Sequence, residues 1–307
     1  MIAAINQETT NWMAVKLMSS VYQASLLEFL QNRWLNCLAY LEVDPESKIA
    51  HKWLNAIVAR YDHHDRIFHD LDRLHDQLQD LQVVAECENA TRLMTASLTF
   101  AMFFQYYEYV PGHTYQVAMC NADTAMLAAK DIGISVGPSD FIYACLVNSW
   151  DKPCHSYNQS IFHDAELSIL GEQPDRYDQY VQYLYLECCD WADERWYEAR
   201  NKWLERMLRR AEKNELYGTL TCRSAINDTA KANMERELAR NIRRLDSISA
   251  FTEADTTPTA LTDPYYDAQE FSDGMKIGEH IYINGVLHMW DGEELVVKET
   301  QSDGIPF

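Results

Sequence analysis

An apolar side chain recurs at every third or fourth position through long stretches of this chain. Between residues 65 and 84, large aliphatic residues follow one another at steps of four, three, four and three: Ile67, Leu71, Leu74, Leu78 and Leu81. This spacing places them on one face of an α-helix, and such a face needs a second layer to cover it. We expect helices over 25–42, 48–61, 65–84, 89–109, 121–132, 138–150, 175–191, 192–213 and 226–248. Only 10 glycines and 8 prolines interrupt the 307 residues, so the sequence predicts an all-α body.

The C-terminal part has a different pattern. From Phe251 to Asp273 the periodicity is lost, and Thr, Asp and Pro are frequent, which is typical of an extended linker or strap. Beyond it, the dipeptides Asn284-Gly285 and Asp291-Gly292 suit type I′ turns and separate runs of β-forming residues. We expect an antiparallel β-meander that packs on the helical body or on another chain. The predicted organisation is a helical extension (1–24), a helical domain (25–248), an acidic linker (249–273) and a meander tail (274–307).

The charge balance excludes some partners. The chain has 47 acidic and 26 basic residues, a formal net charge of -21. Duplex nucleic acid and anionic membranes are therefore poor partners. The first residues do not resemble a signal peptide, and no apolar run is long enough to span a membrane, so we expect a cytoplasmic protein. The eight cysteines form no CxxC pair and are expected to be reduced.

Histidines and aspartates are concentrated between residues 61 and 76. Four histidines lie among five aspartates there: His63, His64, His69 and His75. Imidazole and carboxylate groups are common ligands of divalent metals, which favours a metal site. The alternative is a solvated acidic helix with one or two partly buried histidines, in which Asp70 and Asp76 face water.

Four segments, in collinear order, resemble the metal-dependent phosphohydrolases of the HD superfamily, in a short bacterial branch. The segments are YDHHDRIFHDLDRL at 61–74, NADTA at 121–125, FHDAELSILG at 162–171 and AKANMEREL at 230–238. The resemblance covers residues 25–242, and the last two segments are the most specific. It implies an HD-like helical bundle, in which we expect Asn233 and Glu237 to form hydrogen bonds and the turn at 167–171 to be buried.

In that family, a first His, a His-Asp pair and a later Asp bind one or two divalent cations, which activate water against a phosphoester. The resemblance places the first His at His69 and the later Asp at Asp164, with Glu166 at the position of a second Asp. Gln105 and Tyr106 replace the His-Asp pair. Neither supplies an anionic ligand, so most of the family's metal-ligand positions are lost.

Arg73 occupies the position of another family histidine and brings a fixed positive charge to the place of the cation. Three interpretations follow. Arg73 forms an internal salt-bridge network with Asp164 or Glu166, or it binds an anion such as phosphate. In the third, a metal centre is rebuilt from His69 and Asp164 with nearby histidines: His63, His64, His113 and His163. Two other family positions also differ. Ala122 stands where the family has the Glu of an Asn-Glu pair, with Asp123 beside it. A further family histidine has no clear match, although His155 lies close to its position.

The favoured hypothesis is a catalytically impaired HD-like protein without a cofactor. It would act by binding, with either a nucleotide-like anion in the former metal site or a protein partner on the acidic tail. One alternative is an active metal-dependent phosphohydrolase that acts on a nucleotide or another phosphoester. Another is a structural or assembly component, such as a homodimer formed through the meander. The arginines and aromatic residues at 195–210 could suit stacking on nucleic acid, but their apolar spacing predicts a helix that faces the core.

Overall fold

The computed structural model describes residues 22–111, 115–147 and 156–254, together with three short strands near the C-terminus, and it describes side chains up to residue 248. The chain divides into two units between Asp246 and Ser247. Several predicted features lie outside the described residues. These are most of the expected N-terminal extension, much of the acidic linker, His113, His155 and both turn dipeptides of the expected meander.

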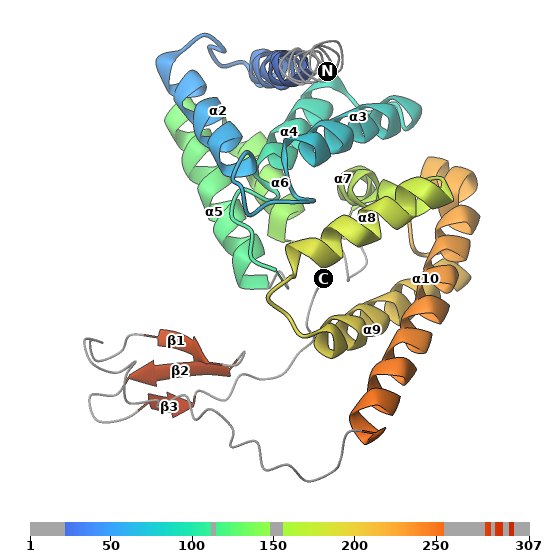
Figure 1. Ribbon diagram of the computed structural model, residues 1–307. Coiled ribbons are helices and arrows are strands. Elements are labelled where there is room, and N and C mark those ends of the chain that lie inside the picture. The colour runs from blue at the N-terminus through green and yellow to red at the C-terminus, as the bar shows by residue number, and fades with distance from the viewer. Residues whose placement is uncertain are drawn as a thin grey trace, which may run out of the picture. The chain divides into compact units, whose positions relative to one another are not determined.

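Helices make up the first unit, as predicted (Figure 1). They comprise residues 22–40, α2 (Lys48–Tyr61), α3 (Leu71–Cys87), α4 (Arg92–Phe104), α5 (Tyr115–Ile132), α6 (Val136–Val147), α7 (Tyr157–Leu167), the 3-10 turn η1 (Ser168–Gly171), α8 (Pro174–Glu187), α9 (Asp193–Glu212) and α10 (Leu220–Ala254). None of these helices combines the length and apolar composition needed to cross a membrane. The all-α prediction for the body is confirmed.

Two local predictions need correction. We expected a helix from Asp65, but α3 begins at Leu71 because the Asp70 carboxylate accepts the Arg73 backbone N–H (2.9 Å) and caps the helix. Residues 62–70 therefore form a loop, and Asp70 is half-buried rather than turned to water. Helix α7 was not among the expected helices. Its signal was the Ser156 N-cap, whose hydroxyl accepts the Gln159 N–H at 3.3 Å.

Helix α4 forms the centre of the core. All nine residues from Ala96 to Phe104 are buried, which is typical of a helix surrounded by others. It packs against α3, α5, α6 and α7. The Trp34 ring lies 5.3 Å from the Phe100 ring and 5.2 Å from the Phe103 ring, and its indole N–H donates to the Ala50 carbonyl (3.2 Å). The N-terminal helix and α2 are thus fixed to α4.

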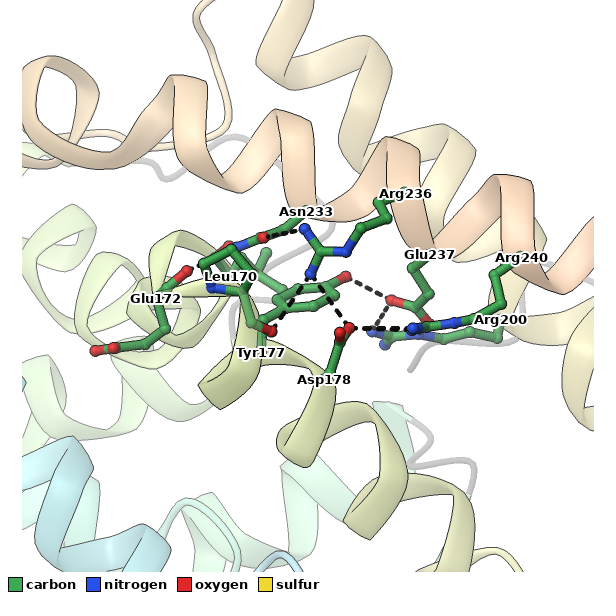
Figure 2. A network of polar contacts seen from close by, with 10 residues as sticks. Leu170, Glu172, Tyr177, Asp178, Arg200, Asn233, Arg236, Glu237 and Arg240 are labelled. Atoms are coloured by element: carbon green, nitrogen blue, oxygen red, sulfur yellow. Dashed lines mark hydrogen bonds and ion pairs between the residues drawn. The ribbon is translucent and has the colours of Figure 1, made fainter.

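A buried polar network joins α8, α9 and α10, as Figure 2 shows. Arg200 of α9 donates two hydrogen bonds to the Glu237 carboxylate of α10, at 2.8 and 3.0 Å. The Tyr177 hydroxyl of α8 donates to the same carboxylate at 2.5 Å. Arg200 is 1% exposed and Glu237 is 0% exposed, so this ion pair is removed from water. Glu237 therefore forms hydrogen bonds within the bundle, as predicted.

Asn233 performs a similar role one turn earlier in α10. Its side-chain amide donates to the carbonyls of Leu170 (2.9 Å) and Glu172 (2.8 Å), which end the η1 turn (Figure 2). Leu167, Ile169 and Leu170 are buried, and a Cβ on Gly171 would lie 2.5 Å from the Ile226 Cβ. The predicted hydrogen bonds of Asn233 and the predicted burial of this turn are confirmed.

Helix α9 presents its aromatic stripe to the interior. Trp196, Ala199, Trp203 and Met207 are all buried. The interpretation of this helix as core-facing is confirmed, and its indole rings are not available for stacking on nucleic acid.

The second unit contains the end of α10, from Ser247, and the strands β1 (His280–Ile283), β2 (Val286–Trp290) and β3 (Leu295–Val297) (Figure 1). They pair antiparallel in the order β1-β2-β3. Ile283 pairs with Val286, and Trp290 pairs with Leu295.

Candidate functional site

A small cavity lies where the loop before α3 meets the end of α4 and helices α8 and α9. Its volume is about 70 Å³. Aromatic rings form much of its wall: Phe68, Tyr106, Tyr109, Tyr180 and Trp203. Its charged and imidazole side chains are His69, Arg73, Glu166 and Arg200. Four of the six residues that the resemblance selected therefore line one cavity, while Gln105 and Asp164 do not.

His69 is held by a carboxylate from the end of α8. Its Nδ1 donates to Glu187 Oε2 at 2.5 Å. The other Glu187 oxygen accepts three consecutive backbone N–H groups, from Ile67 (3.1 Å), Phe68 (3.2 Å) and His69 (3.0 Å). Burial acts to raise the pKa of Glu187, but its interactions with His69 outweigh burial and hold the pKa below its usual value. Glu187 thus fixes both the loop and the ring.

Arg66 fixes the same loop from the other side. Its guanidinium donates to the carbonyls of Tyr106 (2.5 Å) and Tyr107 (2.8 Å), and also to the His69 carbonyl (3.2 Å). The His69 loop and the turn after α4 are therefore joined through backbone atoms. Asn121 holds that turn as well, because its side-chain amide donates to the Gln105 carbonyl at 2.7 Å.

Arg73 is buried but forms few hydrogen bonds with the described residues. Its side chain is in the first turn of α3 and the residue is 6% exposed. One hydrogen bond, from Nη2 to the Glu166 backbone carbonyl (2.7 Å), holds the guanidinium, which also lies 5.3 Å from the centre of the Phe68 ring. No carboxylate of the described residues lies within ion-pair distance of it. The expected salt bridge with Asp164 or Glu166 is therefore wrong.

Gln105 and Tyr106 occupy the turn that follows α4. The Tyr106 hydroxyl donates to Glu166 Oε1 at 2.6 Å. Burial and the nearby Glu166 carboxylate raise the pKa of Tyr106 well above its usual value, so the phenol stays neutral. Gln105 is buried beside it and forms a side-chain hydrogen bond with Glu166.

Glu166 gathers neutral and imidazole donors around its carboxylate. Tyr106 and Gln105 contact it, and His163 Nδ1 lies 3.8 Å from Oε2. Burial acts to raise the pKa of Glu166, but the hydrogen bonds, led by that of His163, hold it below its usual value. The Glu166 carboxylate thus interacts with Tyr106, Gln105 and His163, whereas Arg73 contacts the Glu166 backbone carbonyl.

The Asp164 side chain holds the start of α10. Its carboxylate accepts the backbone N–H groups of Gly218 (2.8 Å) and Thr219 (2.7 Å), and the Thr219 hydroxyl (2.6 Å), at the start of α10. Gly218 approaches α7 closely, because a Cβ on it would lie 2.3 Å from the Ser160 Cβ. Burial raises the pKa of Asp164 although these donors act in the opposite direction. Asp164 is therefore not beside His69 in the cavity, contrary to expectation.

Among the described residues, one group brings three metal-ligand side chains within 4.8 Å of one another. It consists of His63, His64 and Asp65, all exposed in the loop before α3. His69 and Asp164 do not belong to such a group, and both already hold protein partners. The bond from Nδ1 to Glu187 leaves Nε2 of His69 able to bind a metal, but Asp164 is directed to the start of α10 and would have to leave its donors to join it.

The sequence alone did not select Glu187, Tyr109, Tyr180 or Arg200 as site residues, and it predicted Trp203 only as part of the core-facing stripe of 195–210. A signal was present for two of them. Glu187 continues the buried stripe of α8 after Tyr177, Tyr180 and Leu184, and Arg200 interrupts that of α9. A charged residue at a stripe position has to find a buried partner, so it marks a polar network or a site.

Comparison with known proteins adds no relative to this description: no family model, no curated protein and no solved structure matches the chain.

Proposed function

We propose that this protein binds a small oxyanion, such as a phosphate group, at Arg73, and that it works by binding rather than by metal-dependent catalysis. The proposal rests on the N–H donors of the Arg73 guanidinium that have no acceptor among the described residues. A guanidinium has five N–H donors in a fork that matches the oxygens of phosphate and carboxylate. Arg73 is almost fully buried, yet among the described residues its side chain has one hydrogen-bond partner, a backbone carbonyl.

Burial makes this arrangement unusual. A charge removed from water destabilises the folded protein unless it is paired and hydrogen-bonded. Within the described part of the chain, Glu187 accepts from His69, and Glu166 accepts from Tyr106 and lies near His163. Asp80 interacts electrostatically with Arg73, but it accepts the Ser168 hydroxyl and forms no ion pair with the guanidinium. An oxyanion in the cavity would supply the missing negative charge and acceptors.

The volume of the cavity limits which ligands can fit in it. About 70 Å³ is well below the roughly 300–1,000 Å³ of common small-molecule sites. This volume favours one phosphate or carboxylate group over a whole nucleotide, which could place only its phosphate there. The resemblance to phosphohydrolases favours phosphate among the oxyanions.

Titration calorimetry of the full chain with inorganic phosphate tests the proposal. Arg73→Gln should weaken binding at least tenfold. Arg73→Lys should weaken it less, because Lys keeps the charge but loses the fork. Arg209→Gln is the matched control, since it removes the same charge from an exposed position of α9. An unchanged phosphate affinity in Arg73→Gln would refute the proposal, and a parallel titration with acetate separates phosphate from carboxylate recognition.

The competing hypothesis is an active metal-dependent phosphohydrolase on a nucleotide or another phosphoester. It requires a divalent cation and release of phosphate in proportion to added metal. About one bound metal per chain, lost together with that activity in His69→Ala, would establish this function in place of ours.

A second proposal concerns the tail. We propose that residues 274–307 fold as a β-meander that attaches the acidic appendage to the helical body, to a protein partner or to a second copy. The support is the pair of Asn-Gly and Asp-Gly turn signals between β-forming runs. Removal of all residues after Ser249 should lower the melting temperature of a monomer or dissociate a dimer. Unchanged mass and stability would identify the tail as a free appendage.

A further inference from the structure

A second, larger cavity lies against the outer side of Arg73. Its volume is about 300 Å³, and it shares four lining residues with the inner cavity: Phe68, Arg73, Ile169 and Tyr180. Arg73 therefore lies in a wall common to both cavities. A ligand in the outer cavity would therefore lie against Arg73.

Acidic side chains line this outer cavity. Asp70, Asp72 and Asp76 face two arginines, Arg73 and Arg176. Arg176 forms an ion pair with Asp76 and so cancels one of the three negative charges. The remaining two carboxylates have neutral donors: Asp72 accepts the Tyr22 hydroxyl (2.6 Å), and Asp70 accepts the Arg73 backbone N–H (2.9 Å). Neither Asp70 nor Asp72 forms an ion pair with a basic side chain of the described residues.

Aromatic rings accompany these carboxylates. Tyr22, Phe68, Tyr180 and Tyr183 line the same cavity, and the Phe68 and Tyr180 rings lie 4.9 Å apart. Aromatic faces together with carboxylates form the usual environment for an organic ammonium group. The outer cavity thus has the chemistry of a cation site, with Arg73 among its lining residues.

We infer that the ligand is a short zwitterion, with an oxyanion at Arg73 and an ammonium group in the outer cavity beside Asp72. This inference rests on the proposed anion site at Arg73 and names its substrate class: an aminoalkyl phosphate. Asp70, Asp72 and Asp76 all lie within about one helical turn, roughly 5 Å along the axis, of Arg73. Because Arg73 and these carboxylates stand on the same turn of the helix, the inferred ligand has a short linker of two or three carbons between its two charges.

The test compares two ligands that differ only in the ammonium group, 2-aminoethyl phosphate and ethyl phosphate, by calorimetry of the full chain at one pH and ionic strength. The wild type should bind 2-aminoethyl phosphate at least tenfold more tightly. Asp72→Asn should reduce that ratio at least threefold and leave the ethyl phosphate affinity unchanged. Asp123→Asn, the same charge change on an exposed position of α5, should leave the ratio unchanged.

The outcomes separate this inference from the proposed function. Equal affinities for the two ligands would refute the zwitterion, while the anion site would stand if Arg73→Gln abolished both. A preference that survives Asp72→Asn would also refute it, because the outer cavity would not be its source. Failure of both ligands to bind would refute the anion site and the zwitterion together. Asp72 is exposed and an asparagine can still accept the Tyr22 hydroxyl, so this variant should keep the wild-type melting temperature.

Discussion

Two buried arginines of this protein have opposite surroundings. Arg200 donates to both oxygens of Glu237 and to the Tyr180 hydroxyl (3.1 Å), and its guanidinium lies 4.3 Å from the centre of the Trp203 ring. Arg73, almost as deeply buried, has one backbone carbonyl and one ring. The same residue type therefore completes a structural network in one region and leaves donors unused in the other.

A buried arginine with a carboxylate partner has a structural role, whereas one without such a partner is a candidate ligand-binding residue. The Glu237 partner and the surrounding hydroxyls satisfy Arg200 within the fold, and its pKa is raised well above the usual value because Glu237 outweighs burial. No such partner reaches Arg73 within the described part of the chain. We attribute the shortfall to a ligand. The following predictions test this comparison in order of expected effect.

The largest effect is expected from Glu237→Gln. It leaves the Arg200 charge buried without its counter-charge, and loss of one partner of a buried pair costs about 3–5 kcal/mol. Urea denaturation of the two proteins measures the free energy of unfolding. Glu235→Gln, two residues away on α10, removes an exposed carboxylate 3.8 Å from Lys231 and should change stability by less than about 0.5 kcal/mol.

A second substitution sharpens this result. In the Glu237→Gln background, Arg200→Met removes the uncompensated charge and should recover part of the lost stability. Additive losses in the double variant would show that the pair does not act as a unit, and the contrast with Arg73 would lose its basis.

Asn233→Ala should have an intermediate effect. It leaves the carbonyls of Leu170 and Glu172 without their donor, which costs about 1–3 kcal/mol for a buried group. Asn241→Ala is the matched control on the same helix. It is also buried, but its side-chain nitrogen has no hydrogen-bond partner among the described residues, so its loss should cost less. Equal losses in the two variants would mean that the hydrogen bonds of Asn233 do not hold the η1 turn.

Arg73→Met should change stability least among the buried charged positions. It removes one hydrogen bond, worth about 1 kcal/mol, and at the same time removes a desolvated charge. The two terms oppose each other, so we expect a change below about 1 kcal/mol in the absence of ligand. A loss as large as that of Glu237→Gln, measured by the same denaturation, would make Arg73 a structural residue and break the comparison.

The smallest effect is expected from metal ions. If Arg73 holds an anion in place of a cation, the purified protein should contain no stoichiometric transition metal, and chelator should leave its melting temperature unchanged. Elemental analysis for Mn, Fe, Co, Ni and Zn measures the first, and thermal unfolding with and without chelator measures the second. Stoichiometric metal would contradict the proposed function.

The sequence by itself determined the helices and part of their packing. Apolar stripes such as Leu71 to Leu81 specify a helix and its buried face, because side chains three and four positions apart meet on one side. The hydrogen bonds of Asn233 and Glu237 within the bundle were predictable from the family resemblance of their segment. Helix starts are harder to predict. The apolar stripe extends back to Ile67, but a cap at Asp70 starts the helix later. The free-energy difference between two such starts is only a few tenths of a kcal/mol to about 1 kcal/mol.

The contacts between charged side chains that are far apart in the sequence depend on the packing of the helices. His69 and its partner Glu187 are separated by 118 residues, and the Arg73 side chain contacts the backbone of Glu166, 93 residues away. Asp164, expected in the same site, is turned by α7 toward Gly218 and Thr219 instead. A residue's type fixes what it can bind, but the direction of its side chain depends on helix rotation and on distant segments. For that reason the resemblance could select His69, Arg73, Tyr106 and Glu166 as one group, but only the packing of the helices shows that Arg73 forms no ion pair within the described residues.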